Sequence, residues 1–273
     1  MSLCITIVTP EGVVAAGESR QTQFINNVNR VASDSGIKVF ELTNRVVATT
    51  AGWAYLKAHN SPNILNIAAL VEDFKPTIAA GATTLEIAQA MWTHFNDLYQ
   101  QHLAQYPAAA LPAGHVAISF TVAGYNENSR LGELFQFTVP SAVQPAVPQW
   151  TSDNSGTWWI GDTDVIGRIV NGYDGRIFGL PFVQAANAAN NNANAATTAL
   201  QGVNYVISWQ TMTLQDAIDF VVGMIHVTIT VQRFTAGTVN QPGGTATVGG
   251  PIDVAVIRPG GTVEWVARKK LHA

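Results

Sequence analysis

The stretch that decides the fold is residues 2–22, which read SLCITIVTPEGVVAAGESRQT. Two runs of apolar and mostly β-branched residues, 3–8 and 13–16, flank a Pro-Glu-Gly sequence with the chemistry of a tight turn. This pattern predicts a β-hairpin that spans both runs. The hairpin is preceded by a small polar residue, Ser2, and is followed closely by a carboxylate, Glu18.

Further strands are indicated by short apolar runs and by the alternation of apolar with polar residues. They are predicted at residues 38–42, 45–50, 116–122, 134–139, 252–258 and 262–267. Segments rich in asparagine, serine, proline or glycine separate several of these strands. Such segments favour turns and irregular structure, and loops are therefore predicted at residues 23–36, 140–156 and 237–250.

Helices are predicted where a threonine and an acidic residue stand three positions apart ahead of an apolar stripe, which is the spacing of a capping box. Two helices are expected on this ground, after Thr83 and Glu86 and after Thr213 and Asp216. A third is expected from Pro62, where apolar residues share one face, and a shorter one through Ile166. Residues 185–199 consist almost entirely of alanine and asparagine. Because alanine favours helix and asparagine does not, this segment is interpreted as an exposed insertion of uncertain order.

The order of these elements predicts an α+β fold. Mostly antiparallel sheets with segregated helices pack as layers, and each sheet is expected to be covered by helices on its outer face. No linker obviously divides the chain, so residues 1–273 are expected to form one domain.

The composition restricts the partners. Only 12% of the 273 residues are charged, about half the usual share, and the net charge is −4. This balance gives no basic footprint for nucleic acid or for an anionic membrane surface, so neither is expected as a partner. Since the cores of protein interfaces are depleted in charge, the low charge indicates contacts between subunits and predicts a homo-oligomer.

The chain has a single cysteine, Cys4, so it can form no internal disulfide, and this residue is expected to be a small buried hydrophobe. We find no apolar run of membrane-spanning length and no signal peptide, which predicts a cytoplasmic protein. The histidines and carboxylates show no metal-binding spacing, and the glycine pairs at 243–244 and 249–250 lack a following helix with a lysine. Neither a metal nor a cofactor is expected.

Several local motifs, in their order and spacing, resemble one family. They are VVAAGESRQT at 13–22, IKVF at 37–40, TTAG at 49–52, VAGY at 122–125, ELF at 133–135, IGDT at 160–163 and GGPIDVAVI at 249–257. Over nearly its whole length the chain looks like a proteasome β-type subunit, in particular the bacterial HslV and Anbu peptidases. The resemblance implies a four-layer αββα sandwich of the N-terminal nucleophile (Ntn) hydrolase class.

The resemblance also implies a catalytic arrangement. Removal of Met1 would make Ser2 the N-terminal nucleophile, whose own α-amine, with an unperturbed pKa of roughly 7.7–8.0, serves as the general base. A nearby Lys38 ammonium would help to keep that amine neutral, and Glu18 would pair with Lys38 and hold it in place. The backbone N–H of Gly52 would bind the oxyanion.

Other residues acquire expected roles through the same resemblance. Thr22 is expected to contact the main chain of the substrate, which would add to the protein as an extra strand. Arg20, Asp162 and Thr163 are expected to surround and support the nucleophile.

The chain departs from the family pattern at two points. Glu18 stands where the family generally has an aspartate. The family's later acid and serine, near the end of the last long helix, would fall within residues 223–226, where neither is present. Three functions are therefore considered. The first is a peptidase or amide hydrolase that acts on peptides or unfolded proteins inside a homo-oligomer. The second is an inactive assembly subunit that keeps the fold, and the third is an amidase for small molecules. The sequence does not specify an ATPase or activator partner.

Overall fold

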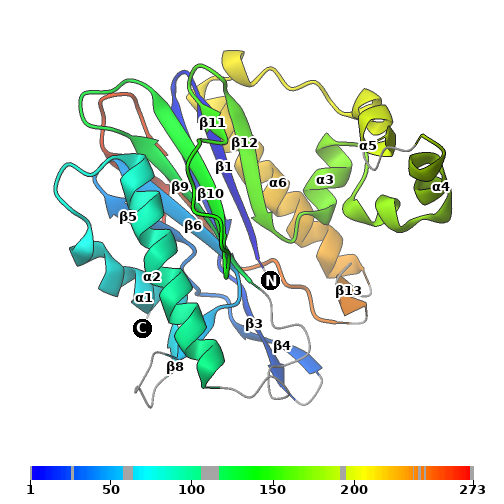
Figure 1. The fold of residues 1–273 in the computed structure, drawn as a ribbon, viewed down its shortest axis with the longest axis horizontal. Coiled ribbons are helices and arrows are strands. Elements are labelled where there is room, and N and C mark those ends of the chain that lie inside the picture. The colour runs from blue at the N-terminus through cyan, green and yellow to red at the C-terminus, as the bar shows by residue number, and fades with distance from the viewer. Residues whose placement is uncertain are drawn as a thin grey trace.

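The predicted N-terminal hairpin lies inside the first of two five-stranded sheets (Figure 1). The computed structural model describes residues 2–25, 28–57, 64–105, 117–190, 195–235, 237–238, 241–242 and 244–270. The strands of the first sheet, in spatial order and all antiparallel, are β12 (Gly156–Gly161), β1 (Leu3–Thr9), β2 (Gly12–Glu18), β15 (Ile252–Ile257) and β16 (Val263–Ala267). The hairpin β1–β2 is thus paired on both sides, which explains why its residues are buried throughout.

The second sheet is also antiparallel. Its strands, in spatial order, are β11 (Trp150–Thr151), β10 (Gly132–Val139), β9 (Ile118–Tyr125), β6 (Val46–Gly52) and β5 (Val39–Thr43). Three small hairpins complete the described strands: β3 (Gln21–Ile25) with β4 (Val28–Ser33), β7 (Tyr55–Lys57) with β8 (Ile64–Asn66), and β13 (Gly237–Thr238) with β14 (Gln241–Pro242).

Two long helices begin at the predicted capping boxes. The described helices are α1 (Ile67–Phe74), α2 (Thr84–Ala104), α3 (Asp164–Val170), α4 (Pro181–Ala189), α5 (Ala195–Leu200) and α6 (Leu214–Phe234). Short 3-10 turns lie at Lys75–Thr77, Gly175–Gly179, Gln201–Val203 and Trp209–Thr211. In α2 the side chains of Thr83 and Glu86 satisfy each other's backbone N–H groups, and Thr213 and Asp216 do the same in α6.

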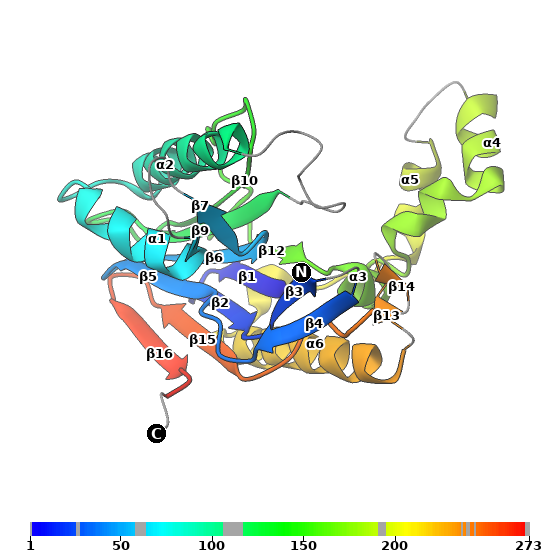
Figure 2. The same ribbon diagram turned by 90° about the horizontal axis from the view of Figure 1, so that it is seen from below.

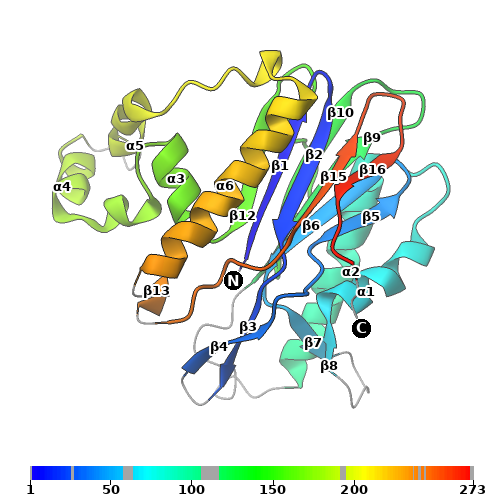
Figure 3. The ribbon, with the colours of Figure 1, turned by 180° about the vertical axis from the view of Figure 1, so that it is seen from behind.

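The helices and sheets form four layers (Figures 2 and 3). Helices α1 and α2 bury their apolar faces against the second sheet, in a core that includes Phe95 and Phe120. Helices α3 and α6 cover the outer face of the first sheet, with Val221 and Ile225 in that core. A third apolar cluster lies between the two sheets and includes Tyr125. The predicted α+β class and αββα layering are confirmed.

Several predicted boundaries were wrong. Residues 23–36 contain most of the β3–β4 hairpin, apart from residues 26–27, which lie outside the described part of the chain. The polar composition favours a loop, but ladder pairing between the two segments overrides that preference. The predicted loop 140–156 likewise contains β11, and the loop 237–250 contains β13 and β14 within its described residues.

Two helical predictions also need correction. The helix expected from Pro62, a residue outside the described chain, begins at Ile67, where the Asn66 side chain accepts a hydrogen bond of 2.8 Å from the Ala69 N–H. The insertion predicted at residues 185–199 includes parts of α4 and α5, while residues 191–194 lie outside the described chain.

Helix α6 is long and apolar enough, by length and composition alone, to cross a membrane, and the sequence analysis had found no such segment. Core helices of soluble proteins pass the same test. One face of α6 does pack on the first sheet, through Leu214, Ala217 and Val221.

Candidate active site

The site begins with Ser2, which immediately precedes β1 and is only 6% exposed. Its carbonyl oxygen accepts a hydrogen bond of 2.6 Å from the N–H of Asp162. Gly161, the last residue of β12, has φ of +100°, and a Cβ at this residue would overlap the Ser2 carbonyl. Only glycine fits this backbone conformation and this close approach, so Gly161 fixes the position of Ser2.

Glu18 lies at the end of β2 and is completely buried. One carboxylate oxygen, Oε1, accepts from the Leu3 N–H at 3.2 Å and pairs with the Lys38 ammonium. The other, Oε2, accepts from the N–H groups of Arg20 at 2.7 Å and Gly249 at 2.9 Å. The carboxylate therefore ties together the residue after Ser2, the turn after β2 and the segment before β15. Such a complete set of donors compensates the cost of burying a charge.

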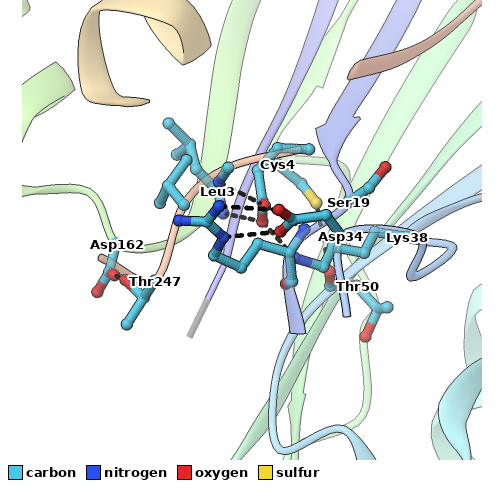
Figure 4. Close-up of polar contacts among 12 residues, drawn as sticks. Leu3, Cys4, Ser19, Asp34, Lys38, Thr50, Asp162 and Thr247 are labelled. Carbon is cyan, nitrogen blue, oxygen red and sulfur yellow. Dashed lines mark hydrogen bonds and ion pairs between the residues drawn. The ribbon is translucent and has the colours of Figure 1, made fainter. Parts of the chain in front are cut away.

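Lys38 reaches the same cluster from the residue before β5 and is 5% exposed. Besides its ion pair with Glu18, its ammonium donates to the backbone carbonyl of Arg20. Gly17 leaves space here, because a Cβ at that residue would lie 2.9 Å from the Cys4 sulfur and 3.4 Å from the Lys38 Cβ. The structure thus brings Lys38, Glu18 and the first residues of β1 together (Figure 4).

Cys4 is fully buried and donates a 3.3 Å hydrogen bond to the Thr50 carbonyl, from the first sheet to the second. Burial raises the pKa of the Cys4 thiol to about 12. It packs with Ala51 and Ile160, as expected for a small hydrophobe.

We expect Cys4 to resist alkylation in the native protein. At pH 8 only about one thiol in 10⁴ would be ionised, and the thiolate is the reactive form. The rate of iodoacetamide labelling should be at least ~100-fold lower in native protein than in urea, since unfolding restores an ordinary pKa. Equal rates in both conditions would show that the N-terminal strand is not packed as described.

Gly52 ends β6 and has φ of +110°, a conformation in which a Cβ would overlap the carbonyl of Ala117. The neighbouring Ala51 Cβ lies 3.1 Å from the point where a Cβ of Gly161 would be, close to the Ser2 carbonyl. The end of β6 therefore borders Ser2, which places the glycine turn beside the candidate nucleophile.

Arg20 and Asp34 form a bidentate ion pair at the partly exposed side of the cluster. The guanidinium Nε and Nη2 atoms donate to the two carboxylate oxygens at 2.7 and 2.9 Å. The hydrogen bonds from Arg20 hold the pKa of Asp34 below its usual range. The backbone of Arg20 contacts Glu18 and Lys38, whereas its side chain forms the ion pair with Asp34.

Asp162 is buried, and its carboxylate lies beside the Thr247 hydroxyl (Figure 4). Its carboxylate accepts a short hydrogen bond from the Thr247 hydroxyl and one of 3.4 Å from the Gln232 amide. The side-chain oxygen of Gln232, Oε1, in turn accepts from the N–H groups of Thr247 and Val248 at 3.0 and 2.9 Å. This network supports the segment that ends at Gly249 and so contributes indirectly to the position of Glu18.

Sequence reasoning missed Gln232 and Thr247. It placed the end of the last long helix near residues 223–226, but α6 continues to Phe234, and Ile225 lies in the middle of the helix, fully buried in the core. The polar residue near the end of α6 is Gln232, two helical turns beyond Ile225. The apolar periodicity up to residue 231 was the signal that could have extended the helix.

A second buried ion pair was also missed. Lys269 pairs with Asp253 of β15 and donates to the Ser19 hydroxyl at 2.8 Å, and that hydroxyl donates to the Pro251 carbonyl at 2.7 Å. Because Ser19 follows Glu18 directly, this contact fixes the turn from its other side.

The two remaining predicted residues lie at the borders of the cluster. Thr22 is half-buried on β3, beyond the turn at Arg20, and pairs with Val31 of β4. Thr163 is the N-cap residue of α3, and its side chain makes no capping hydrogen bond. Within the described residues, no cluster of three or more histidine, cysteine or carboxylate side chains could hold a metal ion.

No protein-family model matches this chain, and no curated protein matches it in sequence. A solved structure does match in fold. It is an Anbu mutant from Hyphomicrobium sp. strain MC1, with a TM-score of 0.52 over 98% of this chain and 88% of that chain, at 12% sequence identity. At this identity the likeness is one of fold. It agrees, at that level, with the resemblance to proteasome-like proteins that the sequence motifs indicated.

Proposed function

We propose that this protein is a proteasome-like amide hydrolase of the N-terminal nucleophile type, with Ser2 as the nucleophile once its α-amine is free. The observation that carries the proposal is the buried Glu18–Lys38 pair, which is anchored directly to the residue after Ser2. An ion pair at this depth is costly without compensating contacts, and the resemblance gives this pair the role of holding a lysine near the nucleophile.

The proposed chemistry uses groups that this end of the molecule provides. The α-amine of Ser2 accepts the proton of its own hydroxyl, and the oxygen attacks the carbonyl carbon of the substrate amide. The Lys38 ammonium favours a neutral amine by like-charge repulsion. The Gly52 N–H donates to the oxyanion of the tetrahedral intermediate. The amine then returns its proton to the leaving nitrogen, and water hydrolyses the resulting ester.

An extended peptide is the proposed substrate. Strand β3 pairs with β4 along one edge, and among the described residues no strand pairs along its other edge. A peptide can add to a strand by main-chain hydrogen bonds, and the resemblance gives Thr22 on β3 that role.

Substitution of Ser2 tests the proposal. With a panel of fluorogenic peptide amides, Ser2→Ala is expected to lower turnover by about 10³-fold or more, because the nucleophile is removed. Ser2→Thr keeps the hydroxyl and should retain activity. Ser208→Ala, at an exposed serine of the 200–212 segment, is the matched control and should be unchanged. Unchanged turnover in Ser2→Ala, or full activity in protein whose intact mass shows Met1 retained, would contradict the proposal.

The contacts of Glu18 also favour a second candidate, an inactive assembly subunit. A carboxylate that holds three backbone N–H groups and Lys38 would stabilise this fold equally well without any reaction. This candidate predicts no labelling of Ser2 by an epoxyketone that reacts with N-terminal nucleophiles, and no turnover of any peptide. Turnover of small amides but not of peptides would instead indicate a small-molecule amidase.

A further inference from the structure

The chain between α3 and α6 forms an arm that stands apart from the layered body. We define the arm as residues 177–206, of which 177–190 and 195–206 are described. The segment that follows returns to the body, where Ile207 and Trp209 pack on the core beneath α6. Figures 2 and 3 show α4 and α5 beyond α3, away from both sheets. Near the end of the arm the Tyr205 N–H donates to the Val170 carbonyl at 2.8 Å, and in the segment that follows the Gln210 amide donates to the Asp153 carbonyl at 3.1 Å.

The arm presents apolar side chains to solvent and carries no charge. Residues 177–215 contain no aspartate, glutamate, lysine, arginine or histidine. Phe182 is 66% exposed and Val206 is 96% exposed, and Leu180, Val203 and Tyr205 are also exposed. A projecting surface of this kind is unusual in a protein that functions alone, because exposed apolar patches mark interaction sites. Aromatic side chains and depletion of charge are also characteristic of interface cores.

A second uncharged surface lies on the outer face of α6. Residues 220–232 contain no aspartate, glutamate, lysine or arginine, and His226 is the single titratable side chain among them. On the side away from the sheet, Val231 is 39% exposed and Phe234 is 78% exposed. Asp219 and Arg233 flank this face. Near the start of α6, Phe220 packs edge-to-face on Trp209, whereas Val231 and Phe234 toward its end remain exposed.

The arm and the outer face of α6 match in chemical character, since both are apolar and uncharged. A charged partner laid on either would lose its hydration without gaining an ion pair, so each surface requires an uncharged partner. One copy of the chain does not supply both sides of the contact, because α4 and α5 lie away from α6 and Phe182, Val231 and Phe234 remain exposed. We propose that the arm of one copy packs on the outer face of α6 of a second copy.

The proposed contact joins two different patches and is therefore heterologous. Each copy would use its arm on one neighbour and its α6 on another, so the contact repeats into a ring if the rotation closes and into a helical filament if it does not. This inference is independent of the proposed chemistry, since an inactive subunit would assemble in the same way.

Two charge-introducing variants of the full chain test the contact. Light scattering after size exclusion should give a multiple of the 29.1 kDa chain mass for the wild type. Phe182→Glu on the arm and Val231→Glu on α6 should each give the monomer mass, because each places an unpaired charge in the contact. Val143→Glu, at another exposed apolar residue outside both surfaces, is the matched control and should keep the wild-type mass.

Mixing the two variants distinguishes the proposed geometry from other ones. Phe182→Glu retains an intact α6 face, and Val231→Glu retains an intact arm, so an equimolar mixture should form a complex of two chains and stop there. Circular dichroism should show that both variants are folded. A monomeric wild type, an unchanged mass for either variant, or a mixture that stays monomeric would each overturn the proposal.

Discussion

Replacement of Glu18 by glutamine is expected to lower the free energy of unfolding by about 3–5 kcal/mol, the usual cost of breaking a buried ion pair. The variant leaves the Lys38 ammonium buried without a counter-ion. It also replaces one acceptor oxygen by an NH2 group, so either the Leu3 N–H or the N–H groups of Arg20 and Gly249 lose their acceptor. Because the carboxylate joins three segments, the loss should appear as a lower urea midpoint and as loss of any peptidase activity.

Two further substitutions make this measurement specific. Glu18→Asp keeps the charge but is one methylene shorter, so it should lose part of the backbone contacts and about 1–3 kcal/mol. Glu72→Gln removes the exposed partner of Lys75 and should cost less than about 1 kcal/mol. If Glu18→Gln changed stability no more than Glu72→Gln, the carboxylate would not have the anchoring role assigned to it.

Gly161→Ala is the second change with a large expected effect. A Cβ at this residue would overlap the Ser2 carbonyl, and its φ of +100° is unfavourable for alanine. The backbone conformation alone should cost about 1–3 kcal/mol, and relief of the overlap requires Ser2 to move away from Asp162. We therefore expect reduced stability in urea together with loss of the turnover attributed to Ser2.

Gly223→Ala is the matched control for this variant. Gly223 lies within α6, and a Cβ there would meet no atom within 4 Å. Alanine in a helix interior is favoured over glycine by about 0.5–1 kcal/mol, so stability should rise slightly. Equal stability and activity of Gly161→Ala and the wild type would show that Gly161 does not fix the position of Ser2.

Local signals predicted much of the fold. Thr83 with Glu86 and Thr213 with Asp216 each place the start of a long helix, because a capping box requires only four consecutive residues. The first hairpin was predicted for the same reason, since its turn and its two apolar runs are adjacent in sequence. The β3–β4 hairpin was missed because its polar strands lack apolar runs beside a recognisable turn. Only the hydrogen-bonded pairing of β3 with β4 identifies them as strands.

The site was harder to predict, because its contacts join residues that are remote in sequence. Glu18 and Lys38 could be named from motifs near the N-terminus, but nothing in those motifs indicates the bond from Gly249, which is 231 residues away. Gln232 was missed because the end of α6 was placed too early. The Gln232 side-chain amide accepts from the N–H groups of Thr247 and Val248. Its role can be recognised only when the end of α6 and the segment before β15 are considered together.

The position of β15 has a consequence for the synthesis of the chain. This strand lies between β2 and β16 in the first sheet, yet it is synthesised long after β2, since Gly249 follows Glu18 by 231 residues. Until residues 249–257 emerge, β2 has an open edge and Glu18 has no Gly249 N–H to accept from. A nascent or stalled polypeptide that stops short of residue 249 therefore lacks a finished site, and Ser2 acquires its full surroundings only after residues 249–257 have been synthesised.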